Sequence, residues 1–325
     1  MADSIPTESD HVNTRLDRFI CRIIDPDEKT SDLRDEMRRM ITTGEFTIRE
    51  LNRYHLSQKI HCSYRFIRFP GKWSILTAAV ASNRCILCLE CVTMKFDLTI
   101  PDGSAEPAVI TACRFKNDFP LTILLRNGVD VEQLNDQNAT ALFFSVAFRD
   151  NEKCIRCLLD HGADKNRMCS YGQAPLSMAI MADNPAAMRI LIEYGADVNA
   201  VNTFGGSRQL HIAASLMRHE CMRVLLEHGA DVEMLDRAGE TPLIITCKNM
   251  DRKGALILLE HGADFARKVN GKNAANTVLG LADDRPNRQL LPEEAEFATA
   301  LLVMEGDREF GLWALREAIA GRVLN

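Results

Sequence analysis

The sequence predicts an all-α solenoid built from short helix-turn-helix units that stack side by side. Five glycines, each closing a leucine-rich segment, recur at spacings of 34, 33, 34 and 33 residues: Gly128, Gly162, Gly195, Gly229 and Gly262. Four of these segments are preceded by related blocks, "NATALFFSV", "GQAPLSMAI", "GSRQLHIAA" and "GETPLIITC", which keep the same phase. A fixed period of this length is typical of repeat architectures, in which each unit buries its apolar face only against its neighbours.

Each unit is expected to begin with a short helix. In "GETPLIITC", Thr241 can cap the helix, and Pro242 occupies the first turn, where a missing N–H is harmless. Ala174 and Arg208 stand at the position of Thr241, so these two middle repeats should lack that cap, at a cost of about 1 kcal/mol each.

A second helix should follow the first in every unit. In "RKGALILLEHG" we expect Leu256, Leu258 and Leu259 to form the packing face. Gly262 should then end the helix in the left-handed backbone conformation.

The repeated blocks resemble a known family. A period near 33 residues, with G-x-T-P-L-H-x-A-A followed by L-L-x-x-G-A-D, is similar to the ankyrin repeat. Residues 239–264 carry "GETPL" and "LLEHGAD", and residues 210–214 supply "LHIAA" one repeat earlier. The resemblance covers five consecutive repeats, from about residue 101 to residue 269. It implies helix pairs joined by short β-hairpin loops.

The resemblance weakens toward both ends, as expected for terminal repeats that meet water on one face. The first repeat, from Gly71, lacks the Gly and Ala after its second helix, and the last is interrupted by an insertion near 282–292. In that last repeat we expect "NGKNAANTVLGLADD" as first helix and "EEAEFATALLVMEGD" as second. The expected organisation is a disordered N-terminus at 1–12, a helical N-terminal cap at 13–69, an ankyrin-repeat domain of about six to seven repeats at 70–310 and a helical tail at 311–325.

The amino-acid composition indicates which class of protein this is. The chain is 46% hydrophobic and 26% charged, which is ordinary for a soluble protein with a substantial core. No apolar run approaches the roughly 20 residues needed to span a bilayer. The N-terminal "MADSIPTESD" lacks the basic start and apolar segment of a secretory signal. We therefore expect a cytoplasmic or nuclear monomer with reduced cysteines and no membrane partner.

A formal charge of −6 also argues against a general nucleic-acid binder. One local exception is Ser31–Lys72, where nine Lys/Arg face five Asp/Glu and the segment ends in "YRFIRFPGKW". It has two interpretations: a basic-aromatic patch for nucleic acid or acidic membrane, or the solvated face of helices. We prefer the second, since "TRLDRFICRII" and "SDLRDEMRRMI" in the cap have helical apolar spacing.

Two cysteine motifs have the spacing of zinc ligands. They are Cys85-x-x-Cys88-x-x-Cys91 and Cys154-x-x-Cys157. On the repeat frame, however, these cysteines fall in second helices, at positions where neighbouring repeats have Val, Ile, Leu or Met. We predict that they act as small hydrophobic residues, and we expect no metal or cofactor.

The recurring histidines have a structural explanation. His161, His228 and His261 each end a second helix, where an imidazole can bond the last carbonyl groups. His211 is expected to bond the loop backbone. The chain has no phosphate-binding loop, G-x-S-x-G or H-E-x-x-H motif, so we expect no enzymatic activity.

The resemblance implies where a partner binds. In ankyrin repeats the hairpin tips and the outward residues of the first helices line a groove. Carried over position by position, the candidate protein-binding residues are Phe148, Tyr171, Met181, Phe204, Leu216 and Arg237. Aromatic and apolar residues at such exposed positions indicate an interface, although packing against adjacent loops would also explain some of them.

One modification site is implied by the same resemblance. "LIEYGADVN", ending at Asn199, is similar to the context in which asparagines of ankyrin repeats are hydroxylated. The context also matches the structural consensus of the repeat.

The first functional hypothesis is a non-catalytic adaptor or scaffold that binds a protein segment in its groove. The alternative is the substrate-recognition subunit of a ubiquitin ligase, whose C-terminal region recruits the ligase core. For that alternative, "LPEEAEFATALLVMEGD" resembles the opening of an F-box, and "LWALREAIAGRVL" resembles an elongin-binding box that lacks its expected Cys. An effector secreted into a host cell would carry the same groove.

Overall fold

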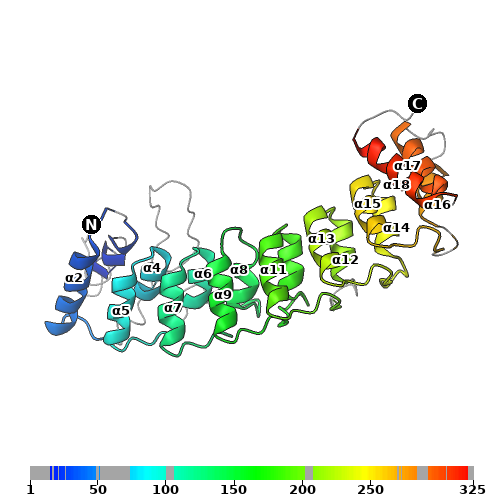
Figure 1. The fold of residues 1–325 in the computed structure, drawn as a ribbon. Coiled ribbons are helices and arrows are strands. Elements are labelled where there is room, and N and C mark those ends of the chain that lie inside the picture. Colours follow the sequence, from blue (N-terminus) through cyan, green and yellow to red (C-terminus); the bar gives the residue numbers. More distant parts are fainter. Residues whose placement is uncertain are drawn as a thin grey trace, which may run out of the picture. The chain divides into compact units, whose positions relative to one another are not determined.

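The computed structural model divides the chain into two units, Met1–Ser170 and Tyr171–Asn325, and describes most of the residues of each. The described residues are 15–51 without 17, 21, 26 and 49–50, then 74–99, 106–201, 208–268, 271, 273–283, 292–304 and 306–320. Within each unit the helices follow one another in pairs (Figure 1). The predicted all-α solenoid of helix-turn-helix units is confirmed.

In the part of the first unit that the structure describes, the cap helix α2 is followed by three helix pairs. First helices pack on first helices and second helices on second helices, which gives two layers, and α2 packs on α5. The bounds are α2 (Thr30–Thr42), α4 (Ile75–Ala81), α5 (Cys85–Thr93), α6 (Ala108–Arg114), α7 (Asp118–Arg126), α8 (Ala141–Ser145) and α9 (Glu152–Asp160).

Polar contacts fix the cap to the first repeat. Arg84, which precedes α5, donates hydrogen bonds to the backbone carbonyls of Ile23 (3.2 Å) and Glu28 (2.7 Å). Arg38 on α2 pairs with the buried carboxylate of Glu90 on α5 at 2.6 and 2.9 Å. The helical N-terminal cap at 13–69 stays a prediction; among its described residues, α2 packs on α5 of the first repeat. The segments 1–12 and "YRFIRFPGKW" lie outside them.

The second unit holds the remaining helices. Its first helices α10, α12, α14 and α16 pack in succession, as do α11, α13 and α15. The bounds are α10 (Pro175–Met181), α11 (Pro185–Glu193), α12 (Gln209–Ser215), α13 (His219–Glu227), α14 (Pro242–Lys248), α15 (Arg252–Glu260), α16 (Ala274–Asp283), α17 (Pro292–Val303) and α18 (Arg308–Ile319).

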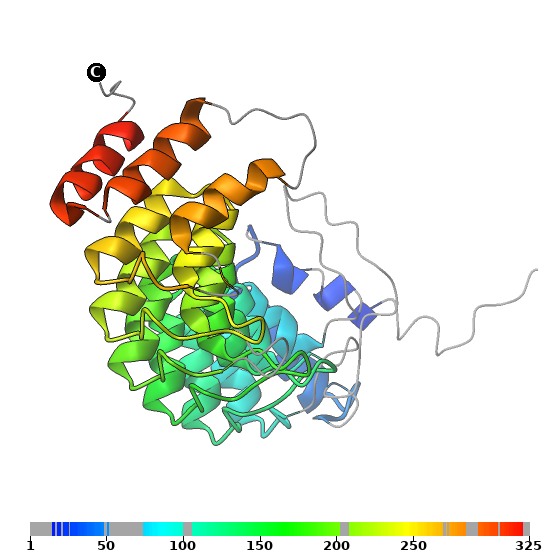
Figure 2. The ribbon, with the colours of Figure 1, turned by 90° about the vertical axis from the view of Figure 1, so that its right-hand side faces the viewer.

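The end of this unit departs from the expected arrangement. Both helices predicted for the last repeat are present, as α16 and α17, but α18 packs along α15 where a second helix would lie. Figure 2 shows α16, α17 and α18 beside one another. Arg308 and Arg316 hold α18 in place, donating to the Leu259 carbonyl (2.8 Å) and to Glu260 (2.7 Å). Of the insertion expected near 282–292, residues 284–291 lie outside the described residues, while residues 282–283 end α16 and residue 292 begins α17.

The predicted helix starts are confirmed. The Thr241 hydroxyl accepts a hydrogen bond from the Ile244 amide at 3.3 Å, and Pro242 occupies the first turn of α14. Thr140 caps α8 in the same way through the Phe143 amide. Ala174 and Arg208 provide no side-chain cap bond to α10 and α12.

The predicted packing face of α15 is wrong at one residue. Leu258 and Leu259 are buried, but the third buried large residue is Ile257, and Leu256 is only half-buried. At 3.6 residues per turn, Leu256 lies about 200° from Leu258 and so faces away from the core. Gly262 has a φ of 94°, as expected for the residue that ends the helix.

The loops are less regular than the expected β-hairpins. Among the described residues they contain one isolated antiparallel bridge, between Val201 and Arg208, and no extended strand. Within the same described part, no helix has the length and apolar character needed to cross a membrane.

Candidate protein-binding surface

Four exposed apolar residues lie on two adjacent repeats of the second unit. Met181 ends α10 and is 40% exposed, and Tyr171, in the loop before α10, is 58% exposed. Leu216 and Met217 follow α12 and are 40% and 51% exposed. Because α10 and α12 pack on one another, their final turns lie side by side. We call these four residues the α10–α12 surface.

The backbone at Met217 is unusual for its side chain. A residue with positive φ recurs in the turn between the two helices of each pair, every 33 or 34 residues: Asn83, Lys116, Asp150, Asp183, Met217 and Met250. The left-handed conformation suits Gly and Asn and costs other residues roughly 1–2 kcal/mol. Methionine occupies this turn position in two neighbouring repeats, at Met217 with a φ of 53° and at Met250 with a φ of 56°, and the Met217 side chain is 51% exposed.

An ion pair lies beside this surface. Arg218, which follows Met217, places a guanidinium nitrogen 3.9 Å from a carboxylate oxygen of Asp183, which follows Met181 by two residues. The charged residues next to the four apolar side chains are therefore paired with one another.

The other predicted binding residues lie elsewhere. Arg237 is exposed in the loop before α14. Phe148 belongs to the first unit and is half-buried. Phe204 lies outside the described residues.

The histidines have the predicted structural roles. His161, His228 and His261 each place Nδ1 2.7 Å from the carbonyl oxygen four residues earlier, and thereby bond the end of their helix. His211 is buried, and its Nε2 lies 3.0 Å from the Glu240 carbonyl oxygen in the next loop. Burial lowers the pKa of His211, which favours the neutral imidazole.

Most cysteines are buried among apolar side chains, as predicted. Burial raises the pKa of Cys91 and of Cys221 to about 12 and the pKa of Cys88 and Cys113 as well. Zinc requires thiolates, so this environment disfavours metal binding. Cys85 and Cys157 are half-buried. The described residues contain no group of three or more His, Cys, Asp or Glu side chains that could hold a metal ion.

Comparison with known proteins decides the family. The family model for ankyrin repeats matches residues 109–202 and 200–269, which hold the helix pairs from α6 and α7 to α14 and α15. The chain belongs to the ankyrin-repeat family. Ankyrin repeats form protein–protein interaction modules that are generally non-catalytic. A comparison with curated protein sequences finds no match.

Solved ankyrin domains share the fold. The ankyrin repeat domain of Bcl-3, a member of the IkappaB family, is 21% identical, with a TM-score of 0.58 over 63% of this chain and 93% of that one. The human ASB11 ankyrin repeat domain is 22% identical, with a TM-score of 0.57 over 71% and 97%. An ankyrin repeat domain from Acinetobacter baumannii is 27% identical, with a TM-score of 0.53 over 58% and 98%.

Asn199 holds two neighbouring ankyrin repeats together. Its side-chain oxygen accepts a hydrogen bond from the Asp231 amide at 3.0 Å, and its amide group donates to the Gly229 carbonyl at 3.3 Å. Glu132 and Glu233 accept from the next repeat in the same way, at 2.9 and 2.8 Å. The position therefore has a structural function in three repeats. Hydroxylation of Asn199 stays a prediction, which intact-mass analysis would test.

A second exposed apolar patch, which was not predicted, lies in the first unit. Ile86 and Leu89 on α5 and Phe119 on α7 are exposed on packed second helices. Ile86 and Phe119 stand at the same position of the repeat, near the start of its second helix. Other repeats have the charged residues Lys153, Glu220 and Lys253 at this position, so the apolar residues could have been recognised from the sequence.

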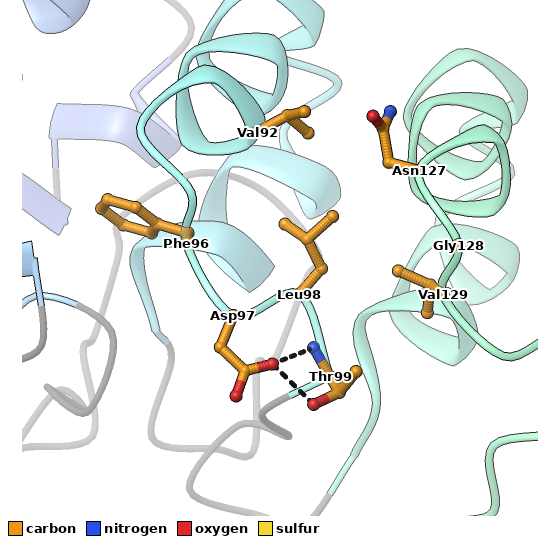
Figure 3. A pocket seen from close by; sticks show the side chains of 8 residues that line it. All are labelled: Val92, Phe96, Asp97, Leu98, Thr99, Asn127, Gly128 and Val129. Atoms are coloured by element: carbon orange, nitrogen blue, oxygen red, sulfur yellow. Dashed lines mark hydrogen bonds between the residues drawn. The ribbon is translucent and has the colours of Figure 1, made fainter.

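A small hollow lies at the other end of the same two helices (Figure 3). It measures about 330 Å³, and Val92, Leu98 and Val129 line it together with Asn127. Asp97 accepts hydrogen bonds from the Thr99 amide and hydroxyl, which fixes the loop below it.

Proposed function

We propose that this protein is a non-catalytic adaptor or scaffold that binds a segment of a partner protein on the α10–α12 surface. The observation that carries the proposal is the exposure of Tyr171, Met181, Leu216 and Met217 on two packed repeats. Tyrosine provides a large contact area at low entropic cost, and methionine adapts to irregular partner surfaces.

The energetics favour this surface as an interface. Complete burial of a large apolar side chain contributes roughly 1.5–3 kcal/mol to the binding free energy. A side chain that is already half-buried before binding contributes about half of that. The four residues together supply enough to anchor a partner, since a few residues dominate most interfaces. The helices beneath them are packed in advance, which reduces the cost of ordering on binding.

Proximity labelling in cells tests the proposal. The double variant Tyr171→Ala plus Leu216→Ala should lose partners that the wild type labels. The matched control is Ile86→Ala plus Leu89→Ala, which removes exposed apolar residues from the other unit and should retain them. Unchanged labelling in a folded Tyr171→Ala plus Leu216→Ala protein contradicts the proposed site.

The ubiquitin-ligase alternative is less well supported. In the segment that resembles an elongin-binding box, Leu312 and Leu315 are buried within the second unit. Their apolar side chains therefore stabilise the array, and recruitment of a ligase core through them would require α18 to detach. Co-purification of ligase components with the full-length chain would restore this alternative.

A further inference from the structure

The terminal helix α18 carries an exposed aromatic pair that the binding surface above does not include. Phe310 is 51% exposed and Trp313 46%, and their ring centroids lie 5.2 Å apart. Leu312 and Leu315 of the same helix are buried. Two large rings at i and i+3 on an otherwise well-packed helix therefore face solvent together.

Acidic residues flank this pair along the helix. Glu309 precedes Trp313 by four residues and Glu317 follows it by four, so each carboxylate lies about one helical turn from the indole. Asp307 caps the helix by accepting from the Phe310 amide at 3.1 Å.

Both cations of α18 bind residues of α15. Arg308 donates to the Leu259 carbonyl, and Arg316, which follows Trp313 by three residues, donates to Glu260. The face that carries Phe310 and Trp313 therefore has acidic residues beside the rings, while the charge of Arg316 is already paired with Glu260.

We propose that this α18 face docks a basic amphipathic segment of a partner protein. An arginine or lysine over the indole of Trp313 would gain a cation–π contact while lying within reach of Glu309. The apolar residues of such a segment would cover Phe310. The two rings already contact each other, so little side-chain freedom is lost on binding. Complementary charge selects a basic partner over an acidic one.

Fluorescence polarisation on the full-length chain tests the inference. The probe is a fluorescein-labelled helical peptide with leucine on one face and arginine on the other, and its acidic twin carries glutamate in place of arginine. The basic peptide should bind, and its affinity should decrease as salt is added, whereas the acidic peptide should not bind.

Variants locate the site. Trp313→Ala should lower the affinity for the basic peptide by at least about tenfold. Glu309→Lys keeps both rings and changes an exposed residue, and it should lower that affinity by about fivefold. Phe119→Ala removes an exposed aromatic residue from the other unit and should leave binding unchanged.

Three results would overturn the inference: equal binding of the two peptides, unchanged affinity in both α18 variants, or self-association of the wild type that Trp313→Ala abolishes. The last would mean that a second copy covers the aromatic pair. Because these variants lie outside the α10–α12 surface, failure here leaves the proposed function untouched.

Discussion

Replacing Ala174 by threonine should stabilise the middle of the array. Ala174 precedes α10 with φ −83° and ψ 162°, within a few degrees of Thr241, which has φ −82° and ψ 158° before α14. Thr241 accepts the Ile244 amide at 3.3 Å, and the corresponding donor in α10 is the Ser177 amide. Both positions are buried to a similar degree, so the hydroxyl should reach its donor without rearrangement.

The expected gain follows from known capping energies. A threonine cap is worth about 1 kcal/mol relative to alanine, within a range of roughly 0.5–2 kcal/mol. Ala174→Val is the matched control, because valine has the shape of threonine without its hydroxyl. The difference between the two variants isolates the hydrogen bond from the added volume.

Amide hydrogen exchange and denaturant unfolding measure the effect. We expect slower exchange at the Ser177 amide in Ala174→Thr than in Ala174→Val, and a free energy of unfolding higher by about 1 kcal/mol. Equal stability and equal exchange in the two variants would refute the capping argument. Greater stability in the valine variant would show that packing, and not the cap, limits α10.

Three further predictions concern single residues of the second unit. Met217→Asn should raise the free energy of unfolding by about 0.5–1 kcal/mol in thermal unfolding, because asparagine tolerates the positive φ, and should weaken partner binding. Asp251→Ala should lower the free energy of unfolding, measured in denaturant, by about 2–4 kcal/mol. The reason is that the buried carboxylate accepts the Gly254 amide at 3.0 Å to cap α15 and lies 2.8 Å from His219 Nε2. Asp251→Asn should lose less than half as much stability, and an equal loss in the two variants would contradict the capping role. Because the pKa of His211 is lowered in the folded protein, the unfolded chain takes up a proton at this residue at a higher pH than the folded chain does. The free energy of unfolding should therefore decrease as the pH falls below about 6.5. The variant His211→Gln should lose less stability than the wild type between about pH 7 and pH 5.

Much of the fold was predictable because the repeat carries its own signals. Thr241 and Pro242 begin a helix and Gly262 ends one through local chemistry, which does not depend on distant parts of the chain. The arrangement at the C-terminus was not predictable in this way. Whether α17 or α18 packs on α15 depends on competing tertiary contacts, such as the hydrogen bond from Arg308 to the Leu259 carbonyl.

The candidate surface was only partly predictable. The repeat frame placed Tyr171, Met181 and Leu216 at exposed positions, because the phase of the repeat determines which way a residue faces. Met217 was missed, since sequence alone does not show that a methionine has positive φ. The pair Phe310–Trp313 was missed because exposure on α18 depends on which of its faces packs against α15 and α17.

Site-specific photo-crosslinking tests the central claim most directly. Benzoylphenylalanine in place of Leu216 should capture a partner protein in cells, while the same group in place of Arg223, exposed on the second helix α13 of the same repeat, should not. Capture that is abolished by adding Met181→Ser to the Leu216 variant would support the α10–α12 surface as the binding site. Equal capture from both positions, or capture from position 223 alone, would contradict it.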